Sequence, residues 1–253
     1  IAVVVGPWVI PNNTEVDFLA PELGAPMLEG GHFFGTDNLG RDLLARTLEG
    51  GRISLMIGLV ATAVSLTIGI GWGATAGYFG GRIDTVMMRI VDILYGLPFM
   101  FFVILLMVLF GNNIYLMFAA IGAVNWLDMA RIVRGQTLSL RKKEFVEAAQ
   151  ALGVGSATII RRHLIPNLLG VVVVYVTLTI PSIILAESFL SFLGLGVQEP
   201  LSSWGSLVNE GVITMESAPW TLLFPAGFLA FTLFAFNFIG DGLRDALDPK
   251  DQA

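Results

Sequence analysis

Residues 144–166 read EFVEAAQALGVGSATIIRRHLIP, and they form the longest polar, basic segment of an otherwise mostly apolar chain. The first part favours a helix over Lys142–Leu152, which Gly153 can end because glycine adopts the left-handed conformation at little steric cost. The second part favours a short helix over Ser156–His163, capped by the hydroxyl of its first residue and stopped at Pro166. The pattern predicts two short helices joined by a glycine turn.

Five residues of this stretch fall at the spacing of a known signature: Glu147, Ala148, Ala149, Gly153 and Pro166. In this respect the stretch resembles the EAA loop of bacterial ABC importer permeases, although His163 stands where Ile is usual and Ile165 where Leu is usual. In that family the loop faces the cytoplasm and docks in a groove of the ATP-hydrolysing subunit. The resemblance implies that the five residues form an ATPase-docking site. The alternative is a basic loop that only fixes the topology.

The chain as a whole is poor in charge. Of its 253 residues, 55% are hydrophobic and 13% are charged, whereas a soluble domain usually carries about 25% charged residues. Long uncharged runs exceed the roughly 20 apolar residues that cross the hydrocarbon of a bilayer. We therefore predict an all-α integral membrane protein with six transmembrane helices, the first only partly present: Ile1–Ile10, Ile53–Tyr78, Ile93–Phe110, Ile114–Ile132, Leu168–Glu187 and Trp220–Ile239.

The basic residues predict the orientation of these spans. Eleven of the 14 Lys and Arg residues lie at or beyond the ends of the second, fourth and sixth spans, and the exceptions are Arg41, Arg46 and Arg52. Lys and Arg favour cytoplasmic loops, so we expect residues 144–166 and both termini of the protein in the cytoplasm. Together with the family resemblance, this predicts a multi-pass protein of the bacterial inner membrane.

The segment before the second span has a pattern of its own. Thr36–Glu49 carries leucines on one helical face and is predicted to be an amphipathic helix on the outer surface, ended by Gly50 and Gly51. We expect Asp37 and Asp42 to serve in capping and ion pairing in preference to metal binding, since the chain has no Cys and only two His.

Two further stretches resemble the peptide and nickel branch of ABC permeases: GTDNLGRDLLARTLEGGRISL at 35–55 and FNFIGDGLRDALDPK at 236–250. Within this branch, the words ISLMIGL, MARIVRGQ and SFLGLG are similar to the oligopeptide type, and a dipeptide or nickel permease remains the alternative. The resemblance implies a type I ABC importer permease core at 53–253 with the docking loop at 140–166. Residues 1–52 would hold the end of the first transmembrane helix and an extracytoplasmic segment.

The resemblance also implies the partners. They are a homologous B-type permease subunit, two ATP-binding cassette ATPase subunits that hold ATP and Mg, an extracytoplasmic peptide-binding receptor and membrane lipid, with no nucleic acid. We expect no enzyme activity, cofactor or metal in the chain itself, because the motifs GxxxxGK[ST], GxSxG and HExxH do not occur in it. A secondary transporter or an intramembrane enzyme is the alternative class, but neither an ion site nor a catalytic set is visible at depth.

Glu187 is the candidate residue for the translocation path. It follows Pro181 at the outer end of the fifth predicted span. Ionisable residues near membrane depth are costly, and they mark either paired groups or a substrate path. We expect Glu187 to line a path for a cationic group of the substrate, and interfacial pairing is the alternative.

Overall fold

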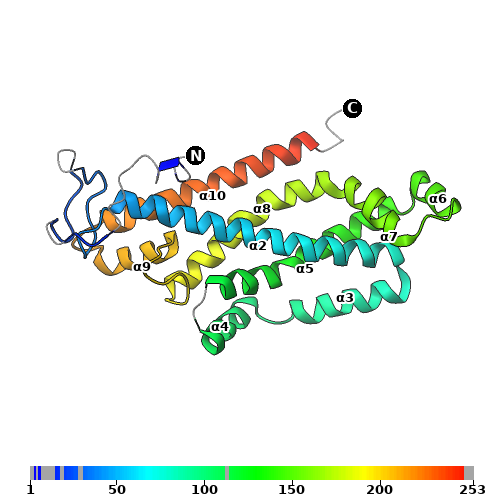
Figure 1. The fold of residues 1–253 in the computed structure, drawn as a ribbon, viewed down its shortest axis with the longest axis horizontal. Helices are drawn as coiled ribbons and strands as arrows, with labels where there is room; N and C mark the ends of the chain where they lie inside the picture. Colours follow the sequence, from blue (N-terminus) through cyan, green and yellow to red (C-terminus); the bar gives the residue numbers. More distant parts are fainter. Residues whose placement is uncertain are drawn as a thin grey trace. The chain divides into compact units, whose positions relative to one another are not determined.

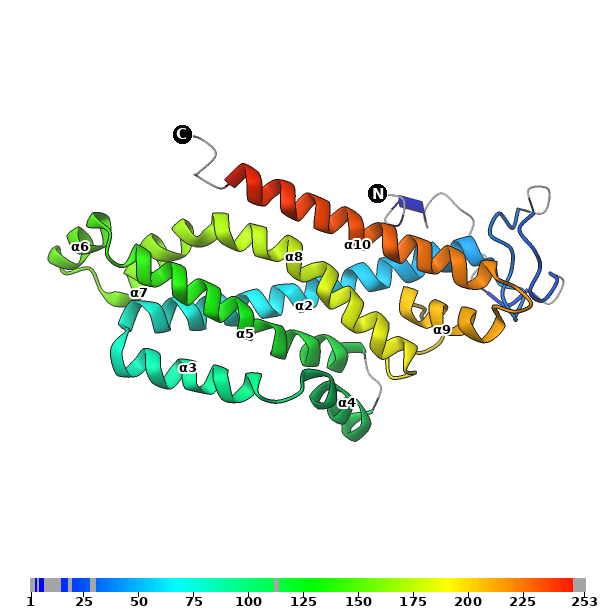
Figure 2. The ribbon, with the colours of Figure 1, turned by 180° about the vertical axis from the view of Figure 1, so that it is seen from behind.

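The computed structural model describes residues 3, 5–6, 15–17, 20–27, 31–111 and 114–247, and within these ranges the protein is built from helices (Figure 1, Figure 2). In the same ranges, an isolated bridge between Thr36 and Asp42 is the only extended pairing. The prediction of an all-α protein is therefore confirmed. The helices are α2 (Leu43–Phe79), α3 (Gly81–Tyr95), α4 (Phe99–Phe110), α5 (Ile114–Leu140), α6 (Glu144–Ala151), α7 (Ser156–Thr158), the π-helix η1 (Ile159–Leu164), α8 (Ile165–Phe192), α9 (Trp204–Thr214) and α10 (Trp220–Leu247).

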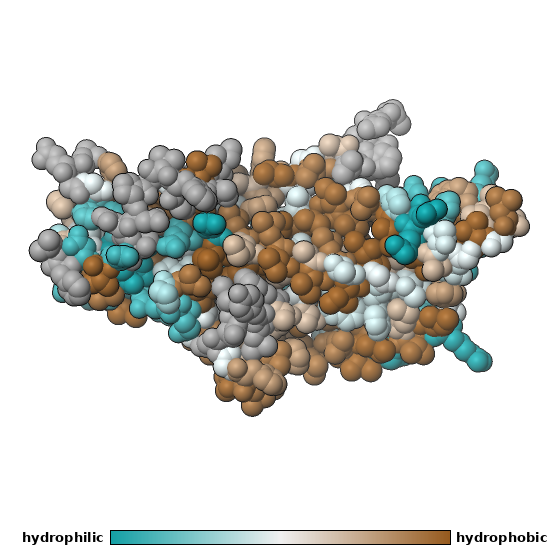
Figure 3. All heavy atoms as spheres, in the orientation of Figure 1, coloured by the Kyte–Doolittle hydropathy of each residue, from teal (hydrophilic) through white to brown (hydrophobic). Residues whose placement is uncertain are grey.

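Three helical runs are long and apolar enough to cross a membrane: Leu43–Phe79, Ser156–Phe192 and Trp220–Ala246. They contain the predicted second, fifth and sixth spans. On the face drawn in Figure 3, brown apolar side chains cover much of the helical surface, as lipid-facing helices require.

Helices α3 and α4 are apolar enough to cross only as a pair, and they are bent by 75° at the break between them. The segment predicted as the third span, Ile93–Phe110, therefore comprises the end of α3 and the whole of α4 with a sharp break between them. Pro98 explains the break, because it removes a backbone donor and disfavours the helical conformation of Leu97 before it.

The remaining predicted spans are not established. Helix α5 is continuous over 27 residues, but it is not among the runs that are apolar enough to cross, and polar residues such as Asn125 and Asp128 interrupt it. The predicted partial span at 1–10 lies largely outside the described residues. The described part of the chain thus holds three candidate spans, or four if the bent pair counts as one, in place of the expected six.

The predicted surface helix over Thr36–Glu49 is not a separate element. Helix α2 begins at Leu43 and continues through Gly50 and Gly51 without a break. The expected stop at these glycines is therefore wrong, and the predicted boundary between residues 52 and 53 falls inside the helix.

The glycine pair serves close packing in this helix. A Cβ at Gly51 would lie 2.7 Å from Cε2 of Trp204, and a Cβ at Gly50 would lie 3.1 Å from Cδ1 of Leu207. Trp204 is fully buried and donates from Nε1 to the carbonyl of Thr47 at 2.9 Å. Burial of this ring offsets the low helix propensity of glycine, which costs about 1 kcal/mol per residue.

The chain divides into two compact units. Unit 1 comprises Ile1–Leu59, Met107–Met117 and Pro181–Phe236, and unit 2 comprises Val60–Leu106, Phe118–Ile180 and Asn237–Ala253. In unit 1 the core around Trp204 includes Val3 and Leu48, with Leu44, Leu55, Phe228 and Leu229 packed against it.

In unit 2, α2 packs on α5 through Gly69, Gly73 and Gly77. A Cβ at Gly69 would lie 2.6 Å from Cβ of Met129, and a Cβ at Gly77 would lie 2.7 Å from Cβ of Thr137. Residue numbers rise together along the contact, so the two helices run parallel. Small residues allow such close approach between helices in a membrane. The adjoining core contains Ala74, Met129, Val133, Leu168 and Val172.

Candidate docking site

Helix α6 forms the first half of the predicted docking loop, and it ends in a glycine turn. Gly153 has a φ of 74°, a conformation that residues with a side chain rarely adopt. The N–H of Val154 donates to the carbonyl of Ala149 at 3.0 Å, and the N–H of Gly153 donates to the carbonyl of Gln150 at 2.9 Å. These two bonds define a Schellman motif. The turn predicted at Gly153 is confirmed.

The two alanines of the motif have different surroundings. Ala149 is buried in a small core of unit 2, whereas Ala148 and the neighbouring Glu147 are exposed. The core that covers Ala149 contains Tyr78, Val146, Ile159 and Leu164. Ala149 therefore holds α6 onto the rest of unit 2, and Ala148 is the alanine that a partner can reach.

The open side of α6 carries an apolar stripe at positions i, i+3 and i+7: Phe145, Ala148 and Leu152. The exposed fraction is 83% for Leu152 and 38% for Phe145. We call these three residues the docking face; the exposed Glu144 and Glu147 flank it. Sequence reasoning missed Phe145 and Leu152, although the helical spacing that groups them with Ala148 is visible in the sequence.

The return from α6 differs from the prediction. The residue that caps α7 is Gly155, without a side-chain bond, so the predicted cap by Ser156 is wrong. The helix also does not stop at Pro166, because α7 continues through the π-turn η1 into α8. The N–H of Ile165 donates to the carbonyl of Ile160 across this wider turn. The exposed Pro166 follows this π-turn inside the continuous helical run, and because proline has no N–H one backbone hydrogen bond of the run is not made there.

Tyr78 joins the docking loop to the end of α2. Its side chain packs against Val146 and Ala149, and its hydroxyl accepts from Nε2 of Gln150 at 3.4 Å. Its carbonyl accepts from Nη1 of Arg141 at 2.9 Å. Figures 1 and 2 show α6 and α7 beside the turn between α2 and α3 in unit 2. A displacement of α6 would therefore be transmitted to the end of α2, which is a candidate spanning helix.

Glu187 lies in α8 and is fully buried in unit 1. Its carboxylate accepts from the hydroxyl of Ser54 at 3.1 Å and from that of Ser191 at 2.6 Å. Ser54 also accepts from the N–H of Trp204 at 3.1 Å. In this conformation the carboxylate ties α2, α8 and α9 together, and its place in a translocation path stays a prediction.

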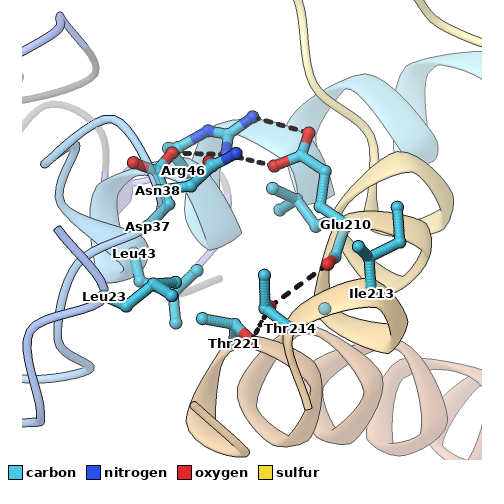
Figure 4. A pocket seen from close by; sticks show the side chains of 11 residues that line it. Leu23, Asp37, Asn38, Leu43, Arg46, Glu210, Ile213, Thr214 and Thr221 are labelled. Atoms are coloured by element: carbon cyan, nitrogen blue, oxygen red, sulfur yellow. Dashed lines mark hydrogen bonds and ion pairs between the residues drawn. The ribbon is translucent and has the colours of Figure 1, made fainter. Parts of the chain in front are cut away.

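A second cluster of buried polar side chains in unit 1 surrounds Arg46 (Figure 4). Arg46 donates from Nη1 to Asp37 at 2.7 Å, and it binds both carboxylate oxygens of Glu210 at 2.6 and 3.0 Å. Arg41 bridges Asp37 and Glu199. Burial by itself lowers the pKa of Arg41, but the hydrogen bonds to Asp37 and Glu199 and the negative charges of these carboxylates together outweigh it, and the pKa lies above the ordinary value. The pairing role predicted for Asp37 is confirmed.

Asp42 has the capping role that the sequence predicted for it. Its Oδ1 accepts from the N–H of Ala45 at 2.8 Å, and its Oδ2 lies 2.9 Å from Nδ1 of His32. Beside the Arg46 network lies a cavity of about 80 Å³, lined in part by Leu43, Thr214 and Thr221. The network holds the start of α2 against α9.

The fold is that of a type I ABC permease. A solved structure of the MetNI methionine ABC transporter in an inward-facing conformation matches 81% of this chain and 96% of that chain, with a TM-score of 0.65 and 19% identity. An amino acid ABC transporter crystallised with histidines matches with a TM-score of 0.51 and 16% identity, over 77% of this chain and 91% of that one.

Sequence comparison then gives the family. The sequence profile of the binding-protein-dependent transport system inner membrane component matches residues 69–250, and the chain belongs to this family. It is 60% identical to the oligopeptide transport system permease protein OppC of Haemophilus influenzae, over 100% of this chain and 81% of that protein. It is 65% identical to OppC of Escherichia coli K12, over 90% and 76%. It is 48% identical to the dipeptide transport system permease protein DppC of Bacillus subtilis, over 98% and 77%.

Proposed function

We propose that this chain is the permease subunit of an ATP-driven importer of oligopeptides in the bacterial inner membrane. The observation that carries the proposal is the docking face, an exposed apolar stripe on a helix whose other side packs on the end of α2. Exposed apolar surface of this kind marks a protein contact. The substrate class is supported by OppC proteins that are 60% and 65% identical to the chain.

The proposal includes partners that supply what the chain lacks. Two ATPase subunits would hold ATP and Mg, a homologous B-type permease would complete the path, and an extracytoplasmic receptor would deliver the peptide. The family's description as a binding-protein-dependent system supports the receptor. The proposed topology places the loop 140–166 and both termini in the cytoplasm, as the distribution of Lys and Arg supports.

Docking would use different residues of the motif in different ways. Leu152, Ala148 and Phe145 would enter an apolar groove of the ATPase, and Glu147 would pair with a donor at its rim. Gly153 would supply the turn, and Ala149 would keep α6 packed on Tyr78. Pro166 lies in the first turn of α8, so motion of the loop would reach this helix as well. Movement of the ATPases would thereby open the path alternately to the two sides.

A dipeptide importer is the second candidate, because DppC of Bacillus subtilis is 48% identical over 98% of the chain. The test uses cells that lack other peptide permeases and carry the chain with its neighbouring subunits. Labelled trialanine, dialanine and Ni²⁺ are offered separately, with and without an intact ATPase. ATP-dependent uptake of trialanine is expected. Uptake of dialanine or Ni²⁺ alone would reject the oligopeptide assignment.

A further inference from the structure

Four polar side chains form a cluster between α3 and α5 in unit 2, away from the docking face. Arg131 donates from Nη2 to Oδ1 of Asp92 at 2.9 Å, and its Cζ lies 4.2 Å from the centroid of the Tyr95 ring. The Tyr95 hydroxyl donates to Oδ1 of Asp128 at 2.6 Å. We call Asp92, Tyr95, Asp128 and Arg131 the polar cluster. It contains two carboxylates and one guanidinium, so its formal charge is negative.

The polar cluster lies at the depth of an uncharged stretch of α2. Gly73 of α2 packs directly on Ala130, which precedes Arg131, and the indole of Trp72 donates to the carbonyl of Met87 on α3 at 3.2 Å. Gly73 stands six residues before Phe79, where α2 ends. At 1.5 Å per residue this distance is about 9 Å along the helix. The cluster is therefore inside the predicted membrane zone, in its cytoplasmic half.

These charges are also accessible. The exposed fraction of the side chain is 41% for Arg131 and 53% for Asp92, and Asp128 is exposed as well. Charged side chains at membrane depth are costly in lipid and face a protein interior or a water-filled cavity. The docking face does not use this cluster, and neither does the Arg46 network of unit 1. An accessible, mixed-charge group at this depth points to a hydrated path.

An apolar hollow adjoins the polar cluster on the same two helices and the start of α4. Its volume is about 130 Å³, slightly smaller than the apolar cavity of roughly 150 Å³ that binds benzene. Val124 and Leu127 lie within one turn of Asp128, and Leu94 precedes Tyr95. The hollow is lined by Leu94, Leu97, Phe99, Phe102, Ala123, Val124 and Leu127. It fits one apolar side chain of a peptide.

We infer that the polar cluster and the hollow together form a subsite that contacts the peptide in the cytoplasmic half of the translocation path. The inference rests on the proposed function. The negative cluster attracts the α-ammonium end of the peptide through Asp128 and Asp92, while Arg131 is available to backbone carbonyls. The hollow takes an adjacent apolar side chain. Every α-peptide offers these groups, so the subsite accepts many sequences.

The first test is capture of a peptide during transport. The chain contains no Cys, so a single introduced thiol is specific. Ala123→Cys places it at the hollow, where Ala123 is exposed. Gly71→Cys is the matched control, because Gly71 is exposed on α2 near Trp72 and nothing lies within 4 Å of its Cβ position. The complete transporter, with receptor and ATP, is given the tripeptide Ala-Cys-Ala under oxidising conditions. We expect a disulfide with the peptide at position 123 and little at position 71.

The second test removes the charge of Asp128. Asp128→Asn keeps an acceptor for the Tyr95 hydroxyl, and Asp128→Glu keeps the charge and serves as the control. The expected result is a fall of roughly 10-fold in trialanine uptake for Asp128→Asn, as for a lost hydrogen bond to a charged group, with unchanged receptor binding and membrane abundance. Asp128→Glu should retain most of the uptake.

The proposed function and the peptide subsite can be rejected separately. If the wild-type complex imports no trialanine with ATP, the proposed function is rejected. If the wild type imports trialanine, but position 123 captures no more peptide than position 71 and Asp128→Asn imports normally, the subsite is rejected.

Discussion

Leu152→Ala is the variant that tests the docking face most directly. Leu152 is 83% exposed, so its truncation removes almost no packing from the chain itself. If the side chain becomes buried on docking, three carbon atoms at about 0.8 kcal/mol each correspond to about 2.4 kcal/mol of lost affinity. This loss is roughly a 60-fold increase in Kd for the ATPase subunit.

The assay is a binding titration of the purified ATPase against the permease pair in lipid nanodiscs. Ile213→Ala is the matched control, because Ile213 is 78% exposed on α9 and loses the same three carbon atoms. We expect wild-type affinity for the control and a matching fall of ATP-dependent trialanine uptake for Leu152→Ala. A Kd for Leu152→Ala within about threefold of the wild type, less than 1 kcal/mol, would refute the assignment of the docking face.

Three further predictions concern the surroundings of this site and the other unit. Ala149→Asp should loosen the loop itself and speed its limited proteolysis, because it buries an unpaired charge, whereas Ala148→Asp should weaken docking and leave the protease pattern unchanged. Arg46→Gln should lower the midpoint of thermal unfolding, since two buried or half-buried carboxylates lose a partner at a cost of about 3–5 kcal/mol; an unchanged midpoint would contradict a stabilising role. In intact cells, an impermeant thiol reagent should label Gln198→Cys and spare Lys142→Cys, and the reverse pattern would overturn the topology.

Part of the docking site was predictable because it depends on residues close in sequence. The turn at Gly153 follows from the φ values that only glycine adopts freely, and the bonds of the Schellman motif stay within six residues. Which of the two alanines is buried, Ala148 or Ala149, was not predictable in this way. Tyr78 covers Ala149, and Tyr78 is about 70 positions away along the chain.

The same distinction applies to the spans. Pro98 lacks a backbone donor and by itself favours a kink, and the structure shows a break of 75° between the two helices on either side of it. Gly50 and Gly51 indicated a helix stop by their local preference, but the ring of Trp204 fills the space beside them and α2 continues. A glycine pair looks the same in the sequence whether the helix stops at it or continues through it. Which of the two happens depends on whether a side chain from a distant part of the chain packs against the glycines.

The sequence by itself determined that this is a helical membrane protein with an EAA-type loop, because long uncharged runs and φ preferences are properties of neighbouring residues. Only the tertiary structure decided which faces of the helices are covered. It placed Asp92 and Tyr95 of α3 against Asp128 and Arg131 of α5, and it left Leu152 open. Burial is a property of the whole packed chain, and contacts between residues far apart in sequence set it.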